Sequence, residues 1–328
     1  MNFLIVGLGS MGKRRARLLA GLGHAVAGVD SAPARREEAA GLGITPHESL
    51  PAALAAGRYD AGLVCTGPLG HSGAITALLE AGLPVFTELN LVADGYAEAV
   101  ALAKAKNLPL FVSNTMLYRA ETAFIARRRA EFAKPVGYLY HIGQYLPDWH
   151  PWENYRDFFV GDARTGGVRE IFAIELPWLC GAFGAARPEF VSAGTLSGLD
   201  LPYKDSVTVH LRHADGTRGV LAVDVVSPKA VRNFEVYGEG LQLFWEGSPA
   251  SLFEYDAENK EKIQIKPYEN AQRDPRYSDN IVENAYLDEL LDFLRVLEGG
   301  TQEKWDPARD LEMIALMDEI ESMEGGHG

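Results

Sequence analysis

The most constraining feature of the sequence is the glycine-rich stretch Gly7-Leu8-Gly9-Ser10-Met11-Gly12, which has the pattern G-x-G-x-x-G. It directly follows an apolar run at residues 2–6 and opens a helical pattern at residues 11–20. In this context the first glycine permits a tight turn, the second lets the backbone approach a pyrophosphate, and the third lets helix pack on strand. Free N–H groups and the helix dipole favour a phosphate anion there. The stretch predicts dinucleotide binding, with the cofactor at Gly7, Gly9, Ser10, Met11 and Gly12.

Asp30 stands at the end of the second predicted strand, residues 25–29. A carboxylate at this position accepts hydrogen bonds from ribose hydroxyls and repels a 2′-phosphate, which favours NAD over NADP. Ser31 and Arg35 follow closely and leave NADP possible. The alternative role for Asp30 is to cap the N-terminus of the next helix.

Strand and helix patterns alternate through the first third of the chain. Predicted strands lie at residues 2–6, 25–29, 43–45, 61–65, 84–87 and 108–113. Predicted helices lie between them at residues 11–20, 33–40, 49–56, 72–80 and 95–106. Short apolar strands that alternate with helices predict a parallel sheet covered on both faces.

The pattern changes after residue 117. Predicted helices lie at residues 119–132, 168–183, 281–297 and 307–323, and predicted strands at residues 136–145, 190–197, 206–212, 219–227, 232–237 and 241–244. The alternation in residues 206–212 is typical of half-buried antiparallel strands. The fold class we predict is therefore an α/β Rossmann domain with a doubly wound parallel sheet, residues 1–117, followed by an α+β domain with an open, mostly antiparallel sheet, residues 118–328.

Composition limits the partners. The chain has 328 residues and a net charge of −14, which disfavours binding to nucleic acid or to an anionic membrane. No apolar run approaches the ~20 residues that a membrane span needs. The two cysteines, Cys65 and Cys180, form no disulfide framework and suit a reducing cytoplasm. The sequence shows no metal-ligand spacing.

The stretch PVFTELNL, residues 84–91, begins like a buried strand and ends on the carboxylate of Glu88. No lysine or arginine lies near Glu88 in the sequence. A charge at the end of a strand of a parallel sheet lies at the edge where ligands bind.

Three stretches resemble the glucose-fructose oxidoreductase/inositol dehydrogenase/MocA (Gfo/Idh/MocA) family: GLGSMGKRRARLL, CTGPLGHSGAITALLEAGLPVF and LPDWHPWENYRDFF. The resemblance implies NAD(P) binding, a second domain with an open antiparallel sheet, and a homodimer or homotetramer assembled through that sheet. The third stretch is similar to a loop of members that act on sugars or precursors of surface polysaccharides. The further cofactor residues that the resemblance implies are Thr66, Gly67, Pro68, His71, Glu88, Leu89 and Asn114.

Two departures from the family concern proton transfer. The family's Glu-Lys-Pro triplet reads Glu88-Leu89-Asn90 here, so a leucine replaces the lysine that shares the acid–base work. The family's acid–base histidine corresponds to Ile174, and only the neighbouring Glu175 is retained. A shift of one residue brings Glu170 to the position of the family's first aspartate.

We therefore predict a rebuilt proton relay, because oxidation of an alcohol needs a base for the hydroxyl proton. The candidate catalytic residues are Glu175, His150 and Tyr118. The candidate substrate-binding residues are Trp149, Trp152, Tyr155 and Arg119. The alternatives are that Glu175 pairs with a buried arginine such as Arg119 or Arg169, that His150 packs its loop, and that the aromatic residues plug a domain seam.

The sequence leaves two functional hypotheses. The first is an NAD(P)-dependent oxidoreductase that acts on a hydroxyl or keto group of a sugar or nucleotide sugar. The second is an NAD-binding protein of the same fold without dehydrogenase activity, either a sensor or partner in polysaccharide metabolism or a protein that uses NAD in a non-redox step.

Overall fold

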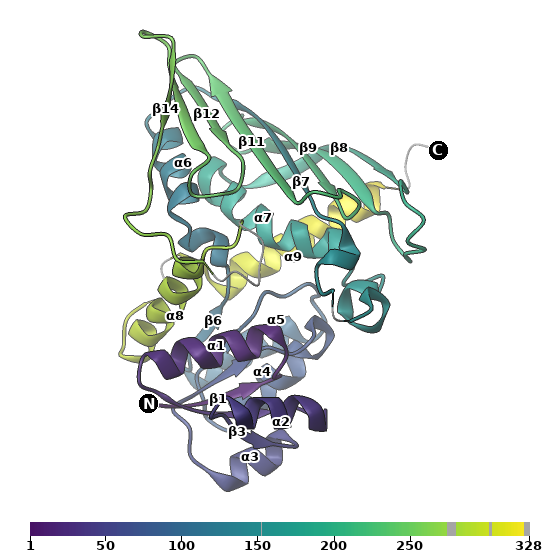
Figure 1. The fold of residues 1–328 in the computed structure, drawn as a ribbon, viewed down its shortest axis with the longest axis vertical. Coiled ribbons are helices and arrows are strands. Elements are labelled where there is room, and N and C mark those ends of the chain that lie inside the picture. The colour runs from purple at the N-terminus through teal and green to yellow at the C-terminus, as the bar shows by residue number, and fades with distance from the viewer. Residues whose placement is uncertain (152, 274–279, 302–303, 325–328) are drawn as a thin grey trace. The chain divides into compact units, whose positions relative to one another are not determined.

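The computed structural model describes residues 1–151, 153–273, 280–301 and 304–324, and the chain forms two compact units (Figure 1). The Rossmann unit comprises Met1–Asn114 and Leu287–Leu311, and the second unit comprises Thr115–Tyr286 and Glu312–Gly328. The sequence predicts one division, after residue 117. The structure instead divides the chain after Asn114 and returns Leu287–Leu311 to the first unit.

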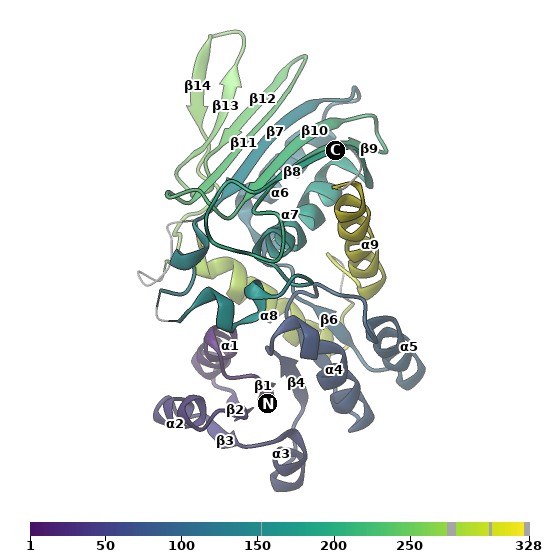
Figure 2. The same cartoon turned by 90° about the vertical axis from the view of Figure 1, so that its right-hand side faces the viewer.

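The Rossmann unit contains a six-stranded parallel sheet with the order β3-β2-β1-β4-β5-β6. Its strands are β1 (Asn2–Val6), β2 (Ala25–Val29), β3 (Thr45–His47), β4 (Ala61–Val64), β5 (Val85–Thr87) and β6 (Leu110–Val112). Its helices are α1 (Ser10–Gly21), α2 (Pro33–Gly41), α3 (Leu50–Ala56), α4 (His71–Glu80) and α5 (Tyr96–Lys106), of which α4 and α5 lie next to each other (Figure 2). The predicted doubly wound sheet is confirmed, and the strand that precedes Glu88 is β5.

Helix α8 (Glu283–Leu297) explains why the Rossmann unit includes a distant segment. Its Phe293 ring lies 5.4 Å from the ring of Phe86 in β5 and 5.5 Å from that of Phe111 in β6. All three side chains are fully buried. Burial of such aromatic rings stabilises each by about 1.5–3 kcal/mol, so α8 completes the core over β5 and β6.

The second unit is built on an eight-stranded sheet with the order β14-β13-β12-β11-β7-β10-β9-β8. Its strands are β7 (Gly137–Gly143), β8 (Ala186–Gly194), β9 (Ser206–His213), β10 (Arg218–Asp224), β11 (Val231–Gly238), β12 (Leu241–Trp245), β13 (Leu252–Asp256) and β14 (Glu261–Gln264). β7 and β10 pair in parallel and the other neighbours are antiparallel, as expected for a mostly antiparallel sheet. β13 and β14 were not predicted, because β14 is polar and exposed and β13 is a short strand in which only Leu252 is fully buried.

Helices α6 (Ala120–Ala130) and α7 (Gly167–Phe183) lie on one face of this sheet (Figure 2). Tyr140 and Phe234 pack from the sheet on Trp178 of α7, with ring centroids 5.6 and 5.2 Å away. Tyr138 stacks on Phe183 of the same helix at 5.0 Å. Side chains on the opposite face, such as Leu139, remain exposed. Helix α9 (Pro307–Met323) closes the chain. No helix within the described ranges is both long and apolar enough to cross a membrane.

Candidate functional site

The glycine loop between β1 and α1 has the shape that its sequence predicts. Gly7 has a φ of +98°, and a Cβ there would lie 2.5 Å from the carbonyl oxygen of Cys65. A Cβ on Gly12 would lie 1.9 Å from the carbonyl oxygen of Gly7. The first and third glycines are therefore required by the fold itself.

Gly9 is different, because a Cβ there would meet only Nη1 of Arg35, at 3.9 Å. Open space in front of Gly9, at the N-terminus of α1, is what a pyrophosphate needs to reach the backbone. Ser10 and Met11 form the first turn of α1 beside it. The loop thus fits the diphosphate of a dinucleotide.

Asp30 supports the glycine loop. Its Oδ2 accepts a hydrogen bond from the N–H of Leu8 at 2.9 Å, and its Oδ1 accepts one from Ala32 N–H at 2.9 Å. Each carboxylate oxygen has a second lone pair, so the side chain can also accept from ribose hydroxyls. The alternative role as N-cap of α2 is wrong, because the N-cap residue is Ala32. Arg35 Nη1 lies 3.8 Å from Asp30 Oδ2 and is half exposed.

Two polar atoms at the carboxyl edge of the parallel sheet lack hydrogen-bond partners among the described residues. They are Oγ1 of Thr66, just beyond β4, and Oδ1 of Asn114, just beyond β6. Buried polar groups are nearly always paired, and ligands of open α/β sheets bind outside the carboxyl ends of the strands. A ligand at this edge would satisfy both atoms.

Gly67 and Pro68 follow Thr66 and lead into α4 through a short 3₁₀ turn, Pro68–Gly70. His71 comes next and is buried. Its Nε2 lies 2.8 Å from the carbonyl oxygen of Thr66, and its Nδ1 lies 3.0 Å from Oδ1 of Asn90. Burial lowers the pKa of His71, and its hydrogen bonds to the Thr66 backbone and to Asn90 oppose that shift.

Asn90 links His71 to a buried acid. Its Nδ2 donates to Oδ2 of Asp310 at 3.0 Å. Burial raises the pKa of Asp310 to about 6. This network uses both ends of the Asn90 side chain within the Rossmann unit. Leu89, beside it, is half-buried and brings no proton-transfer group to the edge.

Glu88 has a partner that the sequence analysis missed. Nε of Arg15 in α1 donates to Glu88 Oε1 at 2.7 Å, and Nη2 of Arg15 donates to Glu289 Oε2 at 2.6 Å. Arg15 and Glu289 are fully buried. The charge at the end of β5 is therefore part of a buried ion cluster.

In the second unit, Glu175 lies in the core of α7 and is fully buried. Its Oε2 accepts hydrogen bonds from the hydroxyl of Tyr140 at 2.7 Å and from Nε1 of Trp178 at 2.6 Å. Its Oε1 pairs with Arg232. The alternative that Glu175 pairs with an arginine is confirmed, but the partner is Arg232 and not Arg119 or Arg169. The structure gives Glu175 a role in the core and does not support its catalytic assignment.

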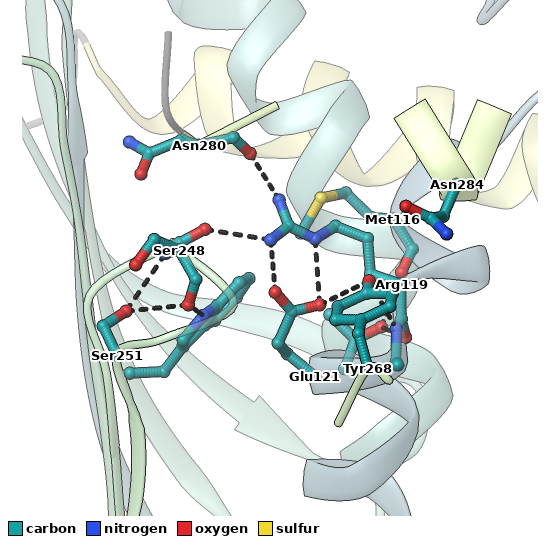
Figure 3. A network of polar contacts seen from close by, with 12 residues as sticks. Met116, Arg119, Glu121, Ser248, Ser251, Tyr268, Asn280 and Asn284 are labelled. Carbon is teal, nitrogen blue, oxygen red and sulfur yellow. Dashed lines mark hydrogen bonds and ion pairs between the residues drawn. The ribbon is translucent and has the colours of Figure 1, made fainter. Parts of the chain in front are cut away.

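Arg119 is likewise engaged within the second unit (Figure 3). Its guanidinium pairs with Glu121 and donates to the carbonyl oxygens of Gly247, at 2.9 Å, and Asn280. The hydroxyl of Tyr268 donates to Glu121 Oε2 at 2.8 Å and completes the network. Arg119 is buried, so the structure does not support its expected role in substrate binding.

The aromatic loop after β7 keeps its remaining candidates partly exposed. Nδ1 of His150 lies 2.7 Å from Oε1 of Glu153, and its ring stacks on Phe158 with centroids 4.8 Å apart. Nε1 of Trp149 donates to the carbonyl oxygen of Gln144 at 3.3 Å. The hydroxyl of Tyr155 donates to the carbonyl of Leu199 at 2.8 Å. Trp152 lies outside the described residues, and Tyr118 is buried at the end of a 3₁₀ turn, Thr115–Tyr118.

Glu170, a second carboxylate of α7, lies in a different environment from that of Glu175. It lies one turn before Ile174, and these two side chains are partly exposed while most of the helix is buried. Its Oε2 is buried without a hydrogen-bond partner in the described part of the chain. Burial raises the pKa of Glu170 to about 8. Burial, and to a lesser extent the charge of Glu170, raises the pKa of the nearby Tyr203 to about 12.

Comparison with family models finds a match in the N-terminal part of the chain. Residues 1–114 match the model of the Gfo/Idh/MocA oxidoreductase family, which is an NAD-binding Rossmann fold. The matched residues include the glycine loop, Asp30, Thr66 and Asn114. A comparison with curated protein sequences finds no match. Among the described residues, no group of three or more histidine, cysteine or carboxylate side chains could hold a metal ion.

Solved structures share the whole fold. An oxidoreductase from Agrobacterium radiobacter, in complex with NAD+, L-tartaric acid and magnesium, has a TM-score of 0.81 at 13% identity, covering 100% of this chain and 97% of its own. A putative myo-inositol dehydrogenase from Sinorhizobium meliloti has a TM-score of 0.77 at 20% identity, with 99% and 97% covered. UDP-N-acetylglucosamine 3-dehydrogenase from Acidithiobacillus ferrooxidans has a TM-score of 0.74 at 19% identity, with 98% and 97% covered. At these identities the likeness shows the fold alone.

Proposed function

We propose that the chain is an NAD(P)-dependent oxidoreductase of the Gfo/Idh/MocA family that acts on a hydroxyl or keto group of a sugar or nucleotide sugar. The observation that carries the proposal is the open space in front of Gly9, where a diphosphate can approach the backbone. The two unpartnered polar atoms of Thr66 and Asn114, at the carboxyl edge of the same sheet, add support. Both features lie within the residues that match the family model.

The residues of the Rossmann unit fit NAD. The glycine loop would hold the diphosphate, and Asp30 would accept from the adenosine ribose. Arg35, at 3.8 Å from Asp30, offers a charge that tolerates a 2′-phosphate, so NADP stays possible. When bound, the nicotinamide accepts a hydride, which carries two electrons from the substrate carbon.

The hydroxyl proton of such a substrate needs its own acceptor, and we propose Glu170 for this role in place of Glu175. A carboxyl whose pKa lies near 8 changes its protonation state close to neutral pH, which suits general acid–base catalysis. Glu175 is fully engaged by Tyr140, Trp178 and Arg232. His150 stays a second candidate because its ring is partly exposed.

The aromatic loop and the similar solved structures favour a sugar-type substrate. Trp149 and Tyr155 are partly exposed and carry the flat apolar surface that stacks on sugar rings. Two of the similar structures are named as a putative myo-inositol dehydrogenase and a UDP-N-acetylglucosamine 3-dehydrogenase. We propose a substrate of that polyhydroxylated class.

The rival proposal is an NAD-binding protein without dehydrogenase activity. It is favoured by the apolar Leu89 and Ile174, which occupy the family's lysine and histidine positions. The side chains of His71 and Glu88 also favour it, because both already form hydrogen bonds within the protein. This protein would bind NAD and show no exchange of hydride.

Calorimetry with NAD+ tests the binding step. Gly9→Ala fits the fold, since φ is −70° and space is open, but it places a methyl group where the diphosphate approaches. We expect it to weaken NAD+ binding at least about tenfold. Gly73→Ala in α4, which also meets nothing within 4 Å, is the matched control and should bind as the wild type does.

Absorbance of NADH separates the two proposals. The protein is incubated with NAD+ and a panel of sugars, polyols and UDP-sugars, and the formation of NADH is followed. Turnover with one of them supports the oxidoreductase, and its loss in Glu170→Gln supports the proton acceptor. Tight NAD+ binding with no turnover on the whole panel would favour the rival proposal.

We also propose that the exposed face of the eight-stranded sheet assembles the chain into a homodimer or homotetramer. Leu139, Phe190 and Tyr237 are exposed on this face at 44–47%. Light scattering on the wild type and on Leu139→Glu tests it, because a buried charge would dissociate an assembly that uses this face. A wild-type protein that is monomeric at all concentrations would contradict it.

A further inference from the structure

A buried network of hydrogen bonds connects the carboxyl edge of the parallel sheet to the first turn of α9. Nε2 of His71 lies 2.8 Å from the carbonyl oxygen of Thr66, and its Nδ1 lies 3.0 Å from Oδ1 of Asn90. Nδ2 of Asn90 donates to Oδ2 of Asp310 at 3.0 Å. His71, Asn90 and Asp310 are each at most 6% exposed, so water does not replace a hydrogen bond that this His71–Asn90–Asp310 network loses.

Thr66, at one end of the network, lies against the glycine loop. Its backbone nitrogen would lie 2.8 Å from a Cβ on Gly7, so the two backbones are in close contact. Its Oγ1 is buried without a hydrogen-bond partner in the described part of the chain. A shift of the Thr66 backbone would therefore disturb both the loop that fits a diphosphate and a polar atom that a ligand can satisfy.

The donors and acceptors of the network match when it holds one shared proton. A carbonyl oxygen only accepts, so the contact with Thr66 requires a proton on Nε2 of His71. When Asn90 donates to an ionised Asp310, its oxygen requires a second ring proton, on Nδ1, and the imidazole is a cation. When the Asn90 amide is reversed, its nitrogen donates to a neutral His71, and Asp310 must be protonated to donate to its oxygen.

Loss of the shared proton breaks one contact of the network. A neutral imidazole donates from only one ring nitrogen, so beside an ionised Asp310 it gives up either Thr66 or Asn90. Reversal of the amide does not help, because its oxygen would then face the carboxylate. Burial lowers the pKa of His71, which hydrogen bonds and the charge of Glu88 oppose, and burial raises the pKa of Asp310 to about 6. The proton therefore leaves as the pH rises through this range.

Two titratable groups, Tyr96 and Asp306, border Asp310. Asp306 adds to the effect of burial on the pKa of Asp310, and hydrogen bonds to the carboxyl oppose it. Nε1 of Trp305 donates one of these bonds, to Oδ1, at 3.4 Å. Burial, with a smaller effect of Asp310, raises the pKa of Tyr96 well above its ordinary value, so this hydroxyl keeps its proton.

We infer that Asp310 is a positioning residue that makes the binding of NAD+ depend on pH. Through Asn90 and His71 it fixes the Thr66 backbone beside the glycine loop, and the shared proton keeps the network intact. The inference rests on the proposed NAD binding and adds a linked proton to it. The cofactor binds best to the protonated network, so binding takes up a proton wherever the free protein has lost it.

Calorimetry with NAD+ between about pH 5.5 and about pH 8 tests the inference. The affinity of the wild type should fall by roughly three- to tenfold as the pH rises across this range. Titrations at about pH 7 in buffers of different ionisation enthalpy should show that binding takes up protons.

Two variants remove the linked proton in different ways. Asp310→Asn supplies an amide that donates to a reversed Asn90 at every pH, so its affinity should stay constant and binding should take up no proton. Asn90→Ala separates His71 from Asp310 and should also abolish proton uptake. Asp60→Asn, the same change at an exposed aspartate of the Rossmann unit, is the matched control and should follow the wild type.

The outcomes are distinct. Failure of the wild type to bind NAD+ at any pH would overturn the proposed function itself. Wild-type binding that is independent of pH and takes up no proton would overturn the inference alone, and this measurement needs no variant to fold. Proton uptake that persists in either Asp310→Asn or Asn90→Ala would also overturn it, because the proton would then belong to another group.

Discussion

Nε of Arg15 lies 2.7 Å from Oε1 of Glu88, although the two residues are 73 positions apart in the chain. This contact joins α1, which follows the glycine loop, to the end of β5. It explains why a carboxylate without a local partner ends a buried strand. A buried acid at a strand end requires a cation from elsewhere in the fold, because an isolated buried charge costs several kcal/mol.

Replacement of Arg15 by glutamine should destabilise the Rossmann unit strongly. Arg15→Gln leaves Glu88 and Glu289 without a cation, and loss of one partner from a buried ion pair costs about 3–5 kcal/mol. Urea unfolding followed by circular dichroism measures the loss. The control is Lys13→Gln in the same helix, where an exposed pair with Glu38 contributes about 0–1 kcal/mol. Equal midpoints for the two variants would contradict a structural role of the cluster.

The raised pKa of Glu170 makes the stability of the folded protein depend on pH. Its pKa of about 8 in the folded protein exceeds its ordinary value of 4.5, so the folded state retains the proton longer than the unfolded state. Its contribution to stability is complete below pH 4.5 and is lost as the pH rises toward 8. Glu170→Gln stays neutral and should gain stability over the wild type across this range, by about 1–3 kcal/mol at the alkaline end.

Unfolding free energies of wild type and Glu170→Gln at a series of pH values check this prediction. Glu258→Gln, which removes an exposed carboxylate of the same unit, should follow the wild type at every pH. A difference between Glu170→Gln and the wild type that does not change with pH would mean that the carboxyl titrates normally.

Glu175 should behave as a core residue. Glu175→Gln leaves the charge of Arg232 uncompensated and should cost about 3–5 kcal/mol of unfolding free energy. His150→Ala removes only a partly exposed pair with Glu153 and should cost about 0–1 kcal/mol. Thermal unfolding compares them. A stable Glu175→Gln protein with a shifted pH profile of turnover would restore Glu175 as a catalytic candidate.

Local patterns in the sequence were enough to predict the sheet of the Rossmann unit and its glycine loop. Strand periodicity, the spacing of Gly7, Gly9 and Gly12, and the helix that follows are all short-range signals. The return of α8 to this unit was not predicted, because Phe293 packs on β5 and β6 across a long sequence separation.

The ion pairs of the candidate site were missed for the same reason. Arg15 meets Glu289 across 274 positions, and Arg232 meets Glu175 across 57. One signal was present, since Arg15 stands between Gly12 and Leu19 on the buried side of α1. A charged residue on a buried helix face predicts a buried counter-ion, but its identity follows only from the fold.

Gly12 of the glycine loop lies directly against the backbone of Gly7. A Cβ on Gly12 would lie 1.9 Å from the carbonyl oxygen of Gly7, and backbone cannot give way as a flexible side chain can. Gly12→Ala should therefore separate α1 from β1, cost about 1–3 kcal/mol of unfolding free energy, and weaken NAD+ binding. Gly73→Ala meets open space within α4 and should stabilise the protein by about 0.5–1 kcal/mol. Calorimetry and urea unfolding on both variants measure these opposite effects, and a Gly12→Ala protein as stable as Gly73→Ala would show that the close packing of helix on strand is not required.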